Sequence, residues 1–116
     1  NLFLTINEKQ TNRFIGTMTI YIEMEHRTAD IGIMIGNKNY WGCGMGGDAW
    51  DVAIKYIFKE YNFRKITAGT ASENFGMIKI MKNAGMHIEA VRAKQHIFSG
   101  EIMDTVHCAI FNNKLS

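Results

Sequence analysis

The first third of the chain shows the residue pattern of β-strands. Segments 2–7 and 14–23 are rich in β-branched and aromatic residues, and the polar stretch 8–13 separates them. This arrangement predicts two antiparallel strands joined by a hairpin connection. In segment 29–36, isoleucines alternate with glycine and methionine before the turn-prone residues 37–39, which predicts a third strand.

The middle of the chain carries an apolar stripe at helical spacing. Within residues 48–61 the large apolar residues recur at i, i+3, i+4, i+7, i+8 and i+11, namely Trp50, Ala53, Ile54, Ile57, Phe58 and Tyr61. These positions share one face of a helix, so the segment predicts an amphipathic helix that packs on a sheet.

The second half predicts a strand, a helix and a hairpin. Segment 65–71 is typical of a short buried strand, and Ser72 is the expected N-cap of a helix that runs to Ala84 and stops at Gly85. Segments 88–98 and 102–111 flank a turn at residues 99–101, which predicts two more paired strands. The expected order is β-β-β-α-β-α-β-β, an α/β fold.

Composition narrows the class of protein. A chain of 116 residues with 47% hydrophobic residues fits one domain, and a net charge of +2 argues against a nucleic-acid partner. Cys43 and Cys108 are too few and too far apart for a disulfide framework, which favours a cytoplasmic setting. No apolar run has the length of a membrane helix and the start lacks the pattern of a signal peptide, so we expect no membrane partner.

A glycine-rich loop precedes the predicted long helix. Residues 41–47 contain Gly42, Gly44, Gly46 and Gly47, whose backbone N–H groups could converge on an anion at a helix N-terminus. A tight packing turn is the alternative. A dinucleotide fold is disfavoured, because paired strands precede the loop and no acidic residue ends the next strand. A P-loop is excluded, because the lysine and hydroxyl residue that should follow its last glycine are absent.

The same loop resembles motif A of the GNAT superfamily of N-acetyltransferases, R/Q-x-x-G-x-G/A. Gly44 and Gly46 take the glycine places and Trp41 replaces the first residue, as in the branch of ribosomal-protein N-terminal and amino-sugar acetyltransferases. Residues 73–86 are similar to the family's E-N-x-x-x-I-x-x-x-x-x-x-G-F. The resemblance covers residues 14–111. It implies a GNAT-like mixed, mostly antiparallel twisted sheet with two main helices.

The resemblance also implies a cosubstrate and the residues that bind it. We expect residues 1–116 to form one acetyl-CoA-binding domain, N-terminally truncated relative to the family, that needs no metal. The backbone of the third strand would pair with the pantetheine arm, the loop amides would hold the pyrophosphate, and an asparagine side chain would bond the arm. In that order the residues are Met34, Ile35 and Gly36; Trp41, Gly42, Cys43, Gly44, Met45, Gly46 and Gly47; and Asn74.

The family's proton-handling residues are largely replaced. The place of its tyrosine acid is Met81, which has no proton to donate, and the place of one glutamate base is Gly69. Asp30 aligns with the place of another glutamate base, so it is the candidate catalytic residue. A solvated strand-edge carboxylate is the alternative for Asp30.

Several functions remain open at this stage. The expected acceptor is a small-molecule amine, with an amino sugar or nucleotide-linked amino sugar ranked before a protein N-terminus. A non-catalytic acyl-CoA-binding module is the alternative from another class. An uncovered edge strand would favour a homo-oligomer.

The histidines and cations of the last two strands suggest two further sites. His87, His96 and His107 fall on adjacent predicted strands, but their spacing matches no metal-ligand motif. Arg92, Lys94 and His96 alternate on one strand face, which would meet either a phosphate-bearing acceptor or solvent.

Overall fold

The computed structural model describes residues 1–35 and 44–112. Its elements follow the predicted order: β1 (Leu2–Asn7), β2 (Phe14–Glu23), β3 (Thr28–Ile35), α1 (Met45–Tyr61), β4 (Lys65–Ala71), α2 (Phe75–Asn83), β5 (His87–Phe98) and β6 (Glu101–Phe111). In the described part of the chain, no helix has both the length and the apolar character needed to cross a membrane.

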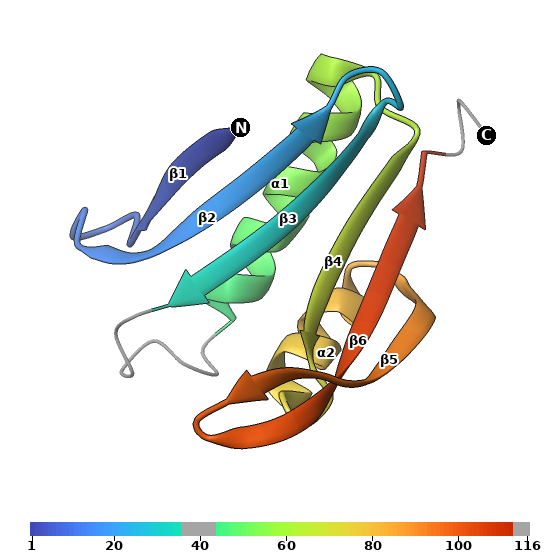
Figure 1. Cartoon of the computed structure of the whole chain (residues 1–116). Helices are drawn as coiled ribbons and strands as arrows, with labels where there is room; N and C mark the ends of the chain where they lie inside the picture. Colours follow the sequence, from blue (N-terminus) through green and yellow to red (C-terminus); the bar gives the residue numbers. More distant parts are fainter. Residues whose placement is uncertain (36–43, 113–116) are drawn as a thin grey trace.

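The strands form one six-stranded sheet in the order β1-β2-β3-β4-β6-β5. Every neighbouring pair is antiparallel except β3 and β4, which run parallel. That parallel pair is in register only from Thr28 opposite Lys65 to Asp30 opposite Thr67. Beyond Asp30 the two strands diverge, and α1 and α2 lie on the same side of the sheet (Figure 1). The sheet therefore opens at its centre.

The core lies between the sheet and the helices. The predicted stripe on α1 is confirmed, because Trp50, Ala53, Ile54 and Ile57 are buried while Phe58 and Tyr61 pack at the edge. Alternate residues of the central strands meet this stripe, among them Ile20, Ile31 and Ile66. Burying one such isoleucine contributes about 1.5–3 kcal/mol, so this layer holds the sheet and helices together.

Both helices begin at other residues than predicted, and α2 ends at Asn83, one residue before the predicted Ala84. Helix α1 begins at Met45 rather than at residue 48, after Gly44 turns the chain with a φ of 90°. Helix α2 is capped by Asn74 rather than Ser72, because the Asn74 Oδ1 atom accepts the Met77 N–H at 3.1 Å. The Ser72 N–H instead donates to the Asp104 carbonyl at 2.9 Å, in the line of the strand that precedes it.

The strand boundaries differ by no more than one residue where they can be compared. Strand β3 begins at Thr28, β5 at His87 and β6 at Glu101. The predicted last residue of the third strand, Gly36, lies outside the described residues. Gly85 has a φ of 90° directly after α2, as expected for a glycine that ends a helix.

Candidate functional site

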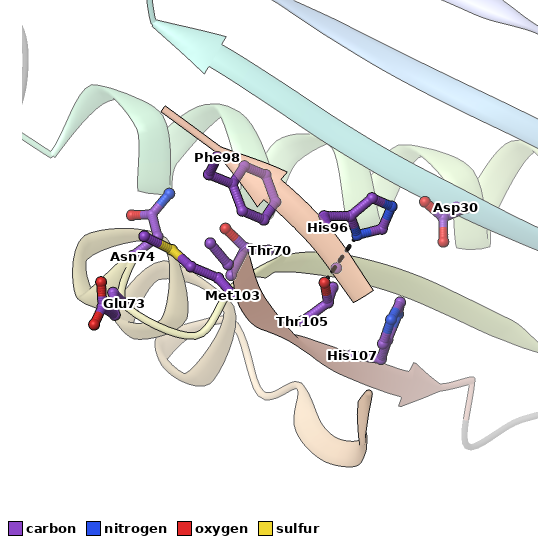
Figure 2. Close-up of a pocket in the computed structure, with 11 residues that line it drawn as sticks. Asp30, Thr70, Glu73, Asn74, His96, Phe98, Met103, Thr105 and His107 are labelled. Carbon is purple, nitrogen blue, oxygen red and sulfur yellow. Dashed lines mark hydrogen bonds between the residues drawn. The ribbon is translucent and has the colours of Figure 1, made fainter. Parts of the chain in front are cut away.

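A cleft of about 650 Å³ lies beside the opening between β3 and β4. Residues of β3, β4, β5, β6 and the start of α2 line it, and Figure 2 shows them: Asp30, Gly69, Thr70, Ala71, Glu73, Asn74, His96, Phe98, Met103, Thr105 and His107. A groove of about 730 Å³ between β1, β2 and α1 is mostly apolar. The cleft has the mixture of carboxylates, imidazoles and apolar groups that is typical of chemical sites.

Asp30 lies at the last paired position of β3. Thr67, its partner on β4, donates its hydroxyl to the Asp30 Oδ2 atom at 2.7 Å, and the Oδ1 atom accepts no hydrogen bond from the described residues. Partial desolvation raises the pKa of Asp30 above its usual value, and the Thr67 hydrogen bond and the electrostatic effect of His107 oppose that rise. Asp30 is an exposed residue, so water reaches its carboxyl group.

His107 fills the space beside Gly69. The two residues are direct partners on β6 and β4. A Cβ atom at Gly69 would lie 3.0 Å from the His107 Nδ1 atom and 3.1 Å from Cε1, closer than ordinary van der Waals contact. The Nε2 atom is buried and has no hydrogen-bond partner among the described residues. Gly69 takes the place of a glutamate base of the family and has no side chain, and the imidazole of His107 on the neighbouring strand lies beside it.

A β-bulge brings His96 into the cleft. The register of β5 and β6 shifts between Arg92 and His96, Lys94 has a φ of 50°, and its N–H donates to Asp104 Oδ1 at 2.9 Å. His96 Nδ1 then lies 2.9 Å from Thr105 Oγ1.

The cleft includes only some of the histidines and cations that the sequence grouped together. The His96 ring lies 5.8 Å from the Phe98 ring, measured between centroids, and both line the cleft. Arg92 and Lys94, which the alternating pattern placed on the same face as His96, do not line the cleft, and neither does His87. Of the residues that the sequence grouped together, His96 and His107 line the cleft, and Arg92, Lys94 and His87 do not.

The start of α1 has the groups that bind an anion. The first intrahelical bond runs from the Asp48 N–H to the Gly44 carbonyl at 3.0 Å, so the N–H groups of Met45, Gly46 and Gly47 have no acceptor within the helix. Gly44 has no side chain to cap them. These amides and the helix dipole fit a phosphate group.

The remaining predicted cofactor residues have different outcomes. Met34 and Ile35 lie on β3 beyond the last residue that pairs with β4, so their backbone has no strand partner on that side. Gly36, Trp41, Gly42 and Cys43 lie outside the described residues. Asn74 lines the cleft, and its Nδ2 donor makes no hydrogen bond with the described residues, because the cap uses only Oδ1.

Met81 lies in the core with no exposed surface, and so has no access to the cleft. Sequence reasoning missed Glu73, Phe98, Met103 and Thr105 as lining residues. No local signal identifies them, because strand pairing and the bulge bring them together. Within residues 1–35 and 44–112, no group of three or more His, Cys, Asp or Glu could hold a metal ion.

Comparison with known proteins identifies the family. The model of the GNAT acetyltransferase domain matches residues 1–87. The chain belongs to this family. It is 30% identical over 103 residues to a probable N-acetyltransferase, YjcK, of Bacillus subtilis (strain 168), a match that covers 87% of this chain and 56% of that protein. An uncharacterized N-acetyltransferase, p20, of Bacillus licheniformis is 30% identical over 97 residues, with coverages of 83% and 54%. The chain thus spans about half the length of these relatives.

Solved structures confirm the predicted fold. A GNAT-family acetyltransferase from Bacillus anthracis superposes with a TM-score of 0.84 at 25% identity, covering 94% of this chain and 65% of that one. The ribosomal-protein-S5-alanine acetyltransferase of Vibrio fischeri gives a TM-score of 0.87 at 21% identity, with coverages of 98% and 63%. The spermidine/spermine N-acetyltransferase SpeG of Vibrio cholerae gives 0.86 at 23% identity, with coverages of 97% and 66%.

Proposed function

We propose that this chain is the acetyl-CoA-binding and catalytic portion of an N-acetyltransferase that acts on the primary amine of a small cationic acceptor. The acceptor amine attacks directly while both substrates are bound. The observation that carries the proposal is the convergence of Asp30, Glu73, His96 and His107 in one cleft beside the opening between β3 and β4. Acetyl-CoA supplies an acetyl thioester as the electrophile.

The chain's own residues suit a cosubstrate with a phosphate-bearing end and an amide-bearing arm. The free N–H groups of Met45, Gly46 and Gly47 bind the phosphates. Together with Trp41, Gly42, Cys43 and Gly44, they form the glycine loop expected from the family resemblance. The backbone of Met34 and Ile35, which has no strand partner on the β4 side, and the Asn74 side-chain amide bind the arm, together with Gly36 as the family resemblance implies.

The lining of the cleft favours a cationic acceptor with an apolar stem. Figure 2 shows Asp30 and Glu73 toward opposite ends, with Phe98 and Met103 between them. Carboxylates attract an ammonium group, and the apolar side chains bury aliphatic carbon. None of the described lining residues is lysine or arginine, so nothing there favours the phosphates of a nucleotide-linked amino sugar. One structural relative, SpeG of Vibrio cholerae, is named a spermidine/spermine N-acetyltransferase. A polyamine is therefore the first acceptor to assay.

We assign Asp30 to binding of the acceptor ammonium, with at most a modest role as a base. An aliphatic ammonium of ordinary pKa near 10.4 is deprotonated about once in 2,500 at pH 7, which costs roughly 5 kcal/mol. A neighbouring carboxylate stabilises the charged ammonium further. Binding by Asp30 therefore increases the need for a separate proton acceptor.

One substitution tests the phosphate site while favouring the helix. Gly47→Asp places a carboxylate in the first turn of α1, where the dipole stabilises it and where a Cβ atom meets no atom of the described residues within 4 Å. The same carboxylate repels phosphate, so we expect CoA to bind at least about tenfold more weakly by calorimetry, a change of about 1.4 kcal/mol. Gly76→Asp makes the matched change in the first turn of α2 and should have a smaller effect. Equal CoA affinity in the parent and the Gly47→Asp variant would place the phosphates elsewhere.

Turnover distinguishes an N-acetyltransferase from a non-catalytic acyl-CoA-binding module. Release of free thiol from acetyl-CoA should accelerate with at least one of spermidine, glucosamine and an alanine-initiated peptide. If CoA binds but no amine accelerates thiol release, the chain is a non-catalytic acyl-CoA-binding module.

A further inference from the structure

The two ring nitrogens of His96 have different surroundings. Nδ1 is paired with the Thr105 hydroxyl at 2.9 Å, and Thr105 is only 4% exposed. Nε2 makes no hydrogen bond with the described residues. Figure 2 shows the ring extending from β5 into the cleft in the direction of Asp30, with Phe98 on its other side. The ring is thus fixed at one nitrogen and available at the other.

We propose that His96 is the general base of this site and that Thr105 is its positioning residue. The proposal rests on the proposed function, because it assigns the proton of the acceptor ammonium to the Nε2 atom of His96. Imidazole is the side-chain type best suited to proton transfer near neutral pH. Asp30 then holds the ammonium and His96 removes its proton.

The hydrogen bond to Thr105 serves both protonation states of His96. In the neutral state that acts as a base, Nδ1–H donates to the Thr105 oxygen and Nε2 presents its lone pair to the cleft. After Nε2 takes a proton, the Nδ1–H bond to Thr105 is unchanged. Proton uptake therefore needs no rearrangement of the ring, which is the advantage of a preorganised base.

The charges around His96 are compatible with this transfer. Asp30 on β3, Glu73 before α2 and His107 on β6 line the same cleft. Asp104, on β6 beside Thr105, accepts the Lys94 N–H. Because the proton passes from an ammonium to an imidazole, the net charge of the cleft does not change, and its carboxylates stabilise the positive charge at either position.

The acceptor ammonium loses two protons in the course of acetyl transfer. Nε2 takes one proton from the ammonium, giving a neutral amine and an imidazolium. The amine lone pair forms the C–N bond to the acetyl carbonyl carbon as the C–S bond breaks. The leaving thiolate takes the second proton from the new amide nitrogen, and His96, which is solvent-exposed, releases the first proton to water.

The test compares His96→Ala and His96→Gln with the parent, using acetyl-CoA and spermidine. We expect kcat/KM at pH 7 to fall by about 10²–10⁴-fold, with a deficit that shrinks as pH approaches the pKa of the amine, because a free amine needs no base. Added imidazole should restore turnover to the His96→Ala variant but not to Asp30→Asn. The matched control is His87→Ala, since His87 is exposed on the same strand and lies outside the cleft.

Thr105→Val removes the hydroxyl with little change of shape. We expect a drop in kcat of about tenfold with little change in KM, and the same dependence on pH. CoA affinity measured for every variant verifies that each one folds.

Two failures are distinguishable. Parent protein that releases no thiol with any amine overturns the proposed function and the role of His96 with it. The role of His96 alone is overturned if the parent protein turns over and one of three results holds for the His96 variants. They keep the parent's rate, they lose activity equally at all pH values, or they gain nothing from imidazole.

Discussion

Replacing Gly69 by alanine tests whether the His107 ring occupies the space beside it. The new Cβ atom would lie 3.0 Å from Nδ1 and 3.1 Å from Cε1, so the ring must move by a few tenths of an ångström. No hydrogen bond to the described residues holds the ring in place. We therefore expect the ring to rotate away from its preferred rotamer, which costs about 0.5–1.5 kcal/mol.

Two effects oppose each other in this variant. Glycine inside a strand is about 0.5–1 kcal/mol less favourable than alanine, so Gly69→Ala alone should change the free energy of unfolding by little. When His107→Ala is added, the clash disappears and the full gain from the backbone remains. A double-mutant cycle over residues 69 and 107 should thus give a coupling energy of about 0.5–1.5 kcal/mol.

The assay is urea-induced unfolding followed by tryptophan fluorescence, since Trp50 is buried and should report loss of the core. Gly32→Ala is the matched control: Gly32 also lies inside a strand, but a Cβ atom there meets nothing within 4 Å in the part of the chain that the structure describes. Its coupling to residue 107 should be zero within the error of such cycles, about 0.3–0.5 kcal/mol. Equal coupling at the two glycines, or a loss above about 2 kcal/mol in Gly69→Ala alone, would refute the proposed packing.

Two further predictions concern stability and cofactor binding. Desolvation raises the pKa of Asp30 above its usual value of 3.8, so the native state binds this proton more tightly than the unfolded state does. The protein therefore loses stability as the pH rises from 3.8 through the pKa of Asp30 in the native state. The free energy of unfolding of Asp30→Asn at neutral pH should therefore exceed that of the parent, by less than about 1 kcal/mol because the side chain is exposed. In unfolding curves this difference should vanish below pH 3.8. A difference that is independent of pH would contradict this. Asn74→Ala should lose the cap to Met77 and about 1 kcal/mol of stability, whereas Asn74→Asp keeps the cap but loses the Nδ2 donor and should bind CoA more weakly by calorimetry. CoA affinity equal to that of the parent in Asn74→Asp would leave Asn74 with a structural role only.

The hydrophobic pattern was sufficient for the elements because each depends on neighbours in sequence. The stripe from Trp50 to Tyr61 specifies a buried helix face whatever it packs against. The start of that helix was predicted too late, because Gly46 and Gly47 have low helix propensity and Met45 has no place in the stripe. Ser72 and Asn74 are both good cap residues, and only the pairing of β4 with β6 decides between them.

The cleft could not be predicted in the same way, because it depends on pairing between distant segments. Gly69 appeared to leave the position of a base empty, and the register of β4 against β6 places His107 there. Register follows from the packing of two whole strands, which one sequence does not state. The family resemblance predicted the fold and the role of the loop, but it assigned no site residue to β5 or β6.

The position of His96 shows how far a local irregularity can change the chemistry of a site. Strict alternation along a strand places Arg92, Lys94 and His96 on one face, which reads as a basic, solvated surface. The bulge between Arg92 and His96, with Lys94 at positive φ and its N–H bonded to Asp104, takes Lys94 out of the pairing, while Arg92 and His96 pair with Thr105 and Met103 on one face of β6. Bulges are frequent beside active sites because they redirect a side chain without ending the strand. Here the bulge puts one imidazole opposite Met103 in the place that regular pairing would give to Lys94, and sets it against Thr105, so the cleft gains a proton acceptor without the charge of Lys94.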